Sequence, residues 1–171
     1  MATQARASQW RNLFNFPNPV NEVSARLVAG GVVLMALTAI VFDQRWITLV
    51  LAYGFVARVL TGPKLSPLGQ LVTRVITPRL PVKAKFVPGP PKRFAQGMGV
   101  AFSVTAAVLA LGFKQWGAAE IVLGLLIGAA TLESVFAYCM GCKIFAYGMK
   151  VGLIPTRYCE ECNNLTLRTS A

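Results

Sequence analysis

The sequence predicts an all-α membrane protein with four transmembrane helices in two hairpins and a short interfacial helix in the loop between the hairpins. Of its 171 residues, 55% are hydrophobic and 13% are charged, and the mean hydropathy is +0.57. Soluble domains are rarely this apolar. The apolar residues are gathered in long runs separated by basic segments, and runs of about 20 apolar residues match the thickness of a bilayer.

The first hairpin is predicted from two apolar runs, which give spans over about 19–42 and 45–62. Asn18 and Pro19 fit the cap and the first position of the first helix. The second span is shorter than a full bilayer crossing and is expected to thin the bilayer locally.

The second hairpin is predicted from the runs over about 94–113 and 120–138. Small residues four positions apart, Gly97 with Ala101 and Gly124 with Gly128, would let helices approach closely, although membrane helices also tolerate such residues without close contacts.

The loop between the hairpins contains a predicted interfacial helix over about 66–77, with Ser66 as its cap. The following segment VPGPPKR, at 87–93, is predicted to be a stiff non-helical spacer because of its prolines. The N-terminal segment 1–17 is predicted to be a further interfacial anchor, because Trp and Phe residues alternate there with polar ones.

Basic residues set the expected orientation. The chain has 17 Lys and Arg against 6 Asp and Glu, and most cations lie in the central loop and near both ends. The positive-inside rule therefore predicts a multi-pass protein of the plasma membrane with both termini in the cytoplasm. The same placement between apolar runs argues against nucleic-acid binding. The residues predicted to contact lipid or a partner are Arg74, Arg79, Lys83, Lys85, Lys92 and Arg93.

The cysteines are the main candidates for chemistry, since the chain has no histidine. Cys139 and Cys142 have the C-x-x-C spacing of thiol redox pairs. A helix break at Gly141 would place Cys142 near a helix N-terminus, which favours a thiolate. On the predicted cytoplasmic side a permanent structural disulfide is not expected.

A four-cysteine zinc site is the alternative. Cys159 and Cys162 in the C-terminal tail 156–171 form a second C-x-x-C pair, and the spacing of all four thiols fits structural zinc. An iron–sulfur cluster would use the same ligands. The third interpretation treats the thiols as small apolar side chains without chemistry.

Glu133 and Arg58 are ionisable residues inside predicted spans, and such residues are functional candidates by default. They are predicted to lie at similar depth, and a structural ion pair that holds the bundle together is favoured over a transport role. A transporter core would show broken helices and repeated polar positions, which the sequence lacks.

Three stretches carry a family resemblance: GPKLSPLGQLVTRVITPRL, VPGPPKRFAQGMG and YCMGCKIFAYGMKVGLIP. Together they resemble a family of small bacterial four-helix membrane proteins catalogued as a domain of unknown function, over about 18–155. Members often occur beside thioredoxin-like proteins or sulfurtransferases, which implies thiol or sulfur chemistry. The family pattern carries over onto Cys139 and Cys142, whereas the tail cysteines are not expected in most members.

Two hypotheses of different classes follow. In the first, Cys139 and Cys142 exchange electrons or sulfur with a soluble thioredoxin-like or sulfurtransferase partner. In the second, the protein is a non-enzymatic scaffold or a small subunit of a larger membrane complex, and zinc is its cofactor. The sequence leaves open whether the protein is an enzyme.

Overall fold

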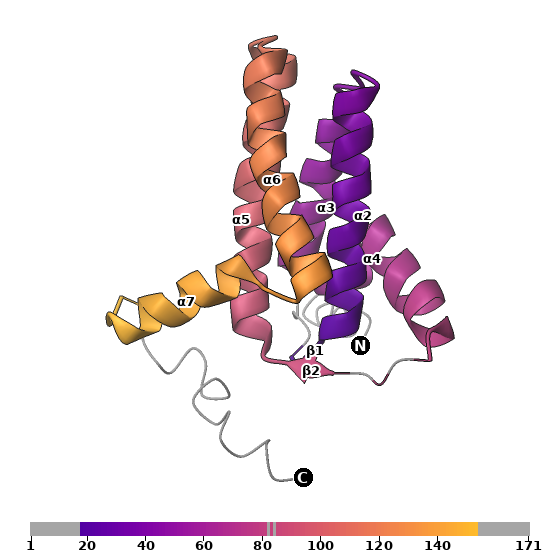
Figure 1. The fold of residues 1–171 in the computed structure, drawn as a ribbon, viewed down its shortest axis with the longest axis vertical. Helices are drawn as coiled ribbons and strands as arrows, with labels where there is room; N and C mark the ends of the chain where they lie inside the picture. The colour runs from indigo at the N-terminus through magenta and orange to yellow at the C-terminus, as the bar shows by residue number, and fades with distance from the viewer. Residues whose placement is uncertain (1–17, 82, 84, 154–171) are drawn as a thin grey trace, which may run out of the picture.

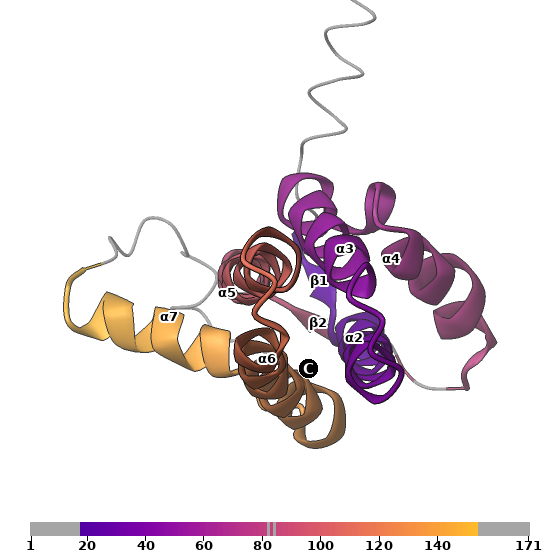
Figure 2. The same ribbon diagram turned by 90° about the horizontal axis from the view of Figure 1, so that it is seen from above.

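Helices make up most of the computed structural model, which describes residues 18–81, 83 and 85–153. Four of them stand side by side: α2 (Glu22–Val41), α3 (Ile47–Thr61), α5 (Gly89–Ala107) and α6 (Trp116–Phe136) (Figures 1 and 2). A π-helical turn, η4 (Val108–Gly112), continues α5. A further helix, α7 (Met140–Lys150), extends sideways from the end of the bundle. The all-α class predicted from the sequence is confirmed.

Within the described part of the chain, three helices are long and apolar enough to cross a membrane: α2, α5 together with η4, and α6. Their outward faces carry large exposed apolar side chains, such as Leu34, Ile121 and Phe136. Soluble proteins rarely expose so much apolar surface, so the helices suggest a membrane-embedded protein. The helix α3 has 15 residues. At 1.5 Å per residue it is about 22 Å long, against about 30 Å for the hydrocarbon core. The fourth crossing stays a prediction.

The helices pack across the two predicted hairpins more than within them. The α3 helix lies mainly against α5, and α2 lies mainly against α6. The core between them is built largely from alanine and leucine, which lets the helix axes approach closely. Fully or almost fully buried members include Ala36, Ala39, Leu51, Ala106, Leu123 and Leu126.

Two predicted boundaries were wrong. The first helix begins at Glu22, and its N-cap is Asn21, whose side-chain oxygen accepts a hydrogen bond from the Val23 backbone N–H at 3.0 Å. Asn18 instead accepts a hydrogen bond from the Gly89 backbone N–H at 2.9 Å.

The second wrong boundary is that of the predicted non-helical spacer at 87–93, because α5 begins inside this segment at Gly89. Pro90 and Pro91 lie in the first turn of α5, where proline is tolerated because the missing N–H would have no partner within the helix anyway. The basic residues at 92 and 93 are therefore helical.

A short antiparallel sheet joins the beginnings of α2 and α5. The strands β1 (Val20–Asn21) and β2 (Phe86–Val87) pair Val20 with Val87. The Glu22 backbone N–H donates to the Lys85 carbonyl at 2.7 Å, and the two side chains form an ion pair at 3.0 Å. The end of the central loop is thereby fixed to the first turn of α2.

The predicted interfacial helix corresponds to α4 (Pro67–Leu71), the π-helical turn η2 (Val72–Ile76) and the 3-10 turn η3 (Thr77–Arg79). Ser66 caps it as expected, since its hydroxyl accepts from the Gly69 backbone N–H at 3.2 Å. Figure 1 shows this segment beside the lower half of α2.

Close helix contacts occur at other glycines than those predicted. A Cβ atom at Gly97, Gly124 or Gly128 would meet no atom within 4 Å. A Cβ atom at Gly99 would instead lie 2.1 Å from the Phe55 ring, in the interface between α3 and α5.

We therefore expect Gly99→Ala to destabilise the protein by about 1–3 kcal/mol, because the buried Phe55 ring must move. Gly97→Ala is the matched control on the same helix. It should be neutral or stabilising by up to about 1 kcal/mol, since alanine is the better helix former. Thermal unfolding of both variants in detergent would test this, and equal unfolding temperatures would contradict the packing described here.

Candidate functional site

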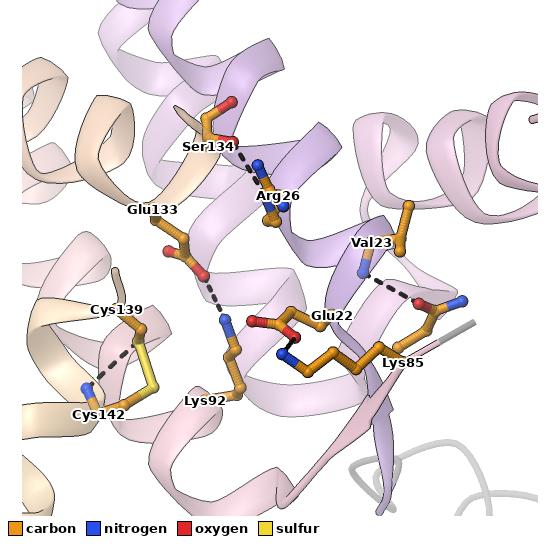
Figure 3. A network of polar contacts seen from close by, with 10 residues as sticks. Glu22, Val23, Arg26, Lys85, Lys92, Glu133, Ser134, Cys139 and Cys142 are labelled. Carbon is orange, nitrogen blue, oxygen red and sulfur yellow. Dashed lines mark hydrogen bonds and ion pairs between the residues drawn. A yellow bond between two sulfur atoms is a disulfide. The ribbon is translucent and has the colours of Figure 1, made fainter. Parts of the chain in front are cut away.

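The end of α6 is held by an arginine from α2. Arg26 Nε donates to the Ser134 carbonyl at 3.0 Å, and Arg26 Nη2 donates to the Val135 carbonyl at 2.9 Å (Figure 3). These carbonyls belong to the last turn of α6, where no N–H from the helix itself can satisfy them. A cation at this position also interacts favourably with the helix dipole. Arg26 therefore determines where α6 stops.

The chain turns sharply directly after α6. Ala137 adopts a left-handed conformation with φ of 55°, and the Tyr138 backbone N–H returns to the Leu132 carbonyl at 3.1 Å. This is a common way to end a helix, although glycine is the usual residue for it. The predicted break at Gly141 is wrong by a few residues, because the turn lies at Ala137.

The next helix, α7, begins at the cysteine pair. Cys139 is its N-cap, and Cys139 Sγ accepts a hydrogen bond from the Cys142 backbone N–H at 3.3 Å. The two cysteines form a disulfide with their Cα atoms 5.2 Å apart. Both sulfurs therefore lie at the positive end of a helix dipole. This position was predicted for Cys142, although the break between the helices lies at Ala137 and not at Gly141.

Gly141, between the two cysteines, brings α7 against α5. A Cβ atom at this position would lie 2.6 Å from the Cα atom of Ala95, so only glycine allows this contact. One turn further along α7, the Phe145 ring lies 5.7 Å from the Phe94 ring of α5. These contacts fix the disulfide relative to the membrane helices.

A pocket of about 610 Å³ opens beside the disulfide. Its walls come from the start of α2, the start of α5, the turn after α6 and the length of α7. The lining includes Lys92, Tyr138, Cys139, Cys142, Lys143 and Lys150. Cys139 is 9% exposed, whereas Cys142 is partly exposed. An incoming group therefore reaches Cys142 more easily.

The charges around the pocket favour negative groups. The Lys143 ammonium lies 5.7 Å from the centre of the Tyr138 ring, within the first turns of α7. The acidic residue nearest in the chain, Glu133, is neutralised by Lys92, whose Nζ lies 2.6 Å from Glu133 Oε1 (Figure 3). Glu22, which also lines the pocket, is paired with Lys85. Thiolates at this helix start would thus face cations and paired carboxylates.

Glu133 and Arg58 do not form the ion pair that the sequence suggested. The partner of Glu133 is Lys92, and both side chains are largely buried, at 17% and 7% exposed. Lys92 was expected among the cations that contact lipid, but its burial and its ion pair assign it to the bundle. Arg58 is also buried, on α3 and beside α4 and α5. Glu133 lies close enough to interact with Arg58 electrostatically, but the two residues form no ion pair.

The remaining predicted residues are spread along one end of the molecule. The exposed cations are Arg74, Arg79, Lys83, Lys85 and Arg93. The anchor 1–17, Cys159 and Cys162 lie outside the described residues, so the zinc site stays a prediction. Within 18–81, 83 and 85–153, no cluster of three or more Cys, Asp or Glu residues is placed to hold a metal ion.

Sequence reasoning missed Arg26 as a residue that shapes the site. A single cation one turn into an apolar run was a usable signal, because such a side chain needs a polar partner. Its partners are backbone carbonyls more than 100 residues away, which only the packing of α2 against α6 brings near.

Comparison with known proteins gives one family. The model of the domain of unknown function DUF4395 matches residues 20–150, which include the disulfide, the pocket and the bundle. No curated protein and no solved structure shows significant similarity to the chain.

The contribution of the buried ion pair between Lys92 and Glu133 to stability can be tested by substitution. Lys92→Met should lower stability by about 3–5 kcal/mol, because it leaves the Glu133 carboxylate buried without a partner. The double variant Lys92→Met/Glu133→Leu should recover most of that loss, since it removes both charges. Thermal unfolding in detergent measures both effects. A double variant as unstable as the single one would show that the pair is not the cause.

Proposed function

The chain belongs to the DUF4395 family, and we propose that it is a membrane protein whose Cys139 and Cys142 form a reversible thiol–disulfide couple. The observation that carries this proposal is the position of the pair: a disulfide at the first turn of α7, open to a pocket lined by cations. Disulfides buried for structural reasons do not need such a helix start or such access.

The hydrogen bond to Cys139 defines the roles of the two sulfurs. When the disulfide opens, Cys139 is the sulfur that the Cys142 backbone N–H and the α7 N-terminus stabilise as a thiolate. A thiol that is a stable thiolate is a good leaving group. Cys142 is the more exposed residue, so it is the sulfur that a partner attacks.

The proposed exchange transfers two electrons from a partner dithiol. A partner thiolate attacks Cys142 Sγ, the bond between Cys139 and Cys142 breaks, and Cys139 leaves as a thiolate. The second partner thiolate then attacks the partner sulfur that is bonded to Cys142 in the mixed disulfide, and Cys142 leaves as a thiolate. The partner ends as a disulfide, and the two thiolates of the chain take up the two protons that the partner thiols lost.

The proposed partner is a soluble thioredoxin-like protein. The pocket beside the disulfide is wide enough to receive a protruding loop with its reactive cysteine, and Lys143 and Lys150 at its edge favour an acidic surface around that cysteine. With a sulfurtransferase as the partner, the reduced pair acts as the nucleophile: the Cys142 thiolate attacks the outer sulfur of the partner's cysteine persulfide. The bond between the two partner sulfurs breaks, the partner cysteine leaves as a thiolate, and Cys142 carries the persulfide.

The proposed placement in the membrane follows from the exposed faces. Four crossings, including a short one by α3, would put both termini, the central loop and α7 at the cytoplasmic surface of the plasma membrane. The exposed apolar side chains of Ile144 and Tyr147 on α7, and of Val151 directly after it, then face the headgroup region. A reducible disulfide in a reducing compartment is usually a working one rather than a permanent bond.

The asymmetry between the two sulfurs tests the proposal. The oxidised chain, with Cys159→Ser and Cys162→Ser to leave this one pair, is treated with reduced glutathione and then quenched with a thiol-alkylating reagent. Mass spectrometry should show glutathione on Cys142 and the alkyl group on Cys139, because glutathione attacks the more exposed sulfur and Cys139 leaves as the thiolate.

Glutathione on Cys139 with the alkyl group on Cys142, or no mixed disulfide at all, would contradict the proposed roles. A circular-dichroism spectrum that is the same before and after the reaction serves as the control for folding.

A further inference from the structure

A second pocket, which neither Cys139 nor Cys142 lines, includes a buried arginine with two nitrogen atoms that are unpaired within the described structure. It has a volume of about 320 Å³ and lies among the start of α2, the end of α3, the helix α4 with η2 and η3, and the strand β2. Arg58 and Gln96 both line it. This pocket is separate from the proposed thiol couple, so neither idea depends on the other.

Arg58 is 5% exposed, and its Nε and Nη1 atoms are buried without a hydrogen-bond partner among the described residues. Its guanidinium stacks on the Phe55 ring at 4.4 Å, which holds the group in one plane but satisfies none of its N–H donors. A guanidinium stays charged under all ordinary conditions, and a buried charge with unused donors is costly. Glu133, the nearest candidate for neutralising it, is already paired with Lys92.

Gln96 contributes a buried hydrogen-bond acceptor that also lacks a partner among the described residues. This acceptor is its side-chain Oε1 atom. Two of the residues that line the pocket therefore carry unpaired buried groups, two donors on Arg58 and one acceptor on Gln96. A single ligand that satisfies all three needs anionic oxygens on one side and a hydroxyl group on the other.

The rest of the pocket fits a small phosphorylated alcohol. Thr73 and Thr77 also line it, with their hydroxyl groups bonded to the Gly69 carbonyl and the Ser24 hydroxyl, and apolar residues such as Val28 and Phe86 line further parts. The planar fork of arginine matches two oxygens of a phosphate group. The exposed cations Arg74 and Arg79 lie on the same helical segment and raise the local concentration of anions.

We propose that the pocket between α2, α3 and α4 binds a glycerol phosphate group, with Arg58 on the phosphate and Gln96 on a glycerol hydroxyl. The group can come from the headgroup of an anionic phospholipid such as phosphatidylglycerol or from a free phosphate ester. The size of the pocket admits this group but not acyl chains, which in a lipid would lie along the apolar outer faces of the helices.

The test measures binding to the full chain in detergent by native mass spectrometry and by thermal shift. The probes are phosphatidylglycerol, zwitterionic phosphatidylcholine and water-soluble glycerol phosphate. Wild type should bind phosphatidylglycerol about tenfold or more tightly than phosphatidylcholine. Arg58→Gln should abolish this preference. The control Lys114→Gln removes one positive charge from an exposed position outside this pocket and should keep the preference.

A second variant keeps the test decisive if Arg58→Gln folds poorly. Gln96→Glu places a carboxylate in the pocket beside Arg58, so it should raise the unfolding temperature without lipid and abolish the stabilisation by phosphatidylglycerol. Stabilisation by glycerol phosphate that depends on Arg58 would support the site with a soluble ligand as its source. Equal binding of phosphatidylglycerol by wild type, Arg58→Gln and Gln96→Glu would overturn the proposal, as would no binding of any probe.

Discussion

The capping of α6 by Arg26 is the interaction on which the candidate site depends. It ends the helix at Phe136 and allows the left-handed turn at Ala137, after which the chain leaves the bundle. Without that change of direction, Cys139 and Cys142 would continue α6 and lie at a helix C-terminus, where the dipole disfavours thiolates. The turn converts the same two residues into the beginning of α7.

The buried ionisable residues of this fold are accommodated in two ways. Lys92 and Glu133 neutralise each other beside the disulfide, so the pair supports the site without adding net charge to it (Figure 3). Arg58 has no ion-pair partner among the described residues, and its Nε and Nη1 atoms are buried without hydrogen-bond partners there. The strand β2 lines both the pocket beside the disulfide and the pocket that includes Arg58.

Much of the fold could be predicted from the sequence, because apolar runs and caps such as Ser66 are local signals. The start of α5 was missed because its prolines were interpreted as helix breakers, whereas proline is also well suited to the first turn of a helix. The site was predicted only in part. The spacing of Cys139 and Cys142 is visible in the sequence, but the partner of Glu133 and the role of Arg26 depend on contacts between residues far apart in the chain.

The central claim is that Cys139 and Cys142 cycle between dithiol and disulfide. The most direct measurement equilibrates the full chain, purified in detergent under nitrogen, with glutathione buffers of defined potential, and determines its zinc content in parallel. Mass spectrometry of the peptide containing both residues follows their redox state. The account predicts a two-electron transition, with a tenfold change in the equilibrium for each ~30 mV. One zinc per chain, with all thiols released only by a chelator, would contradict it.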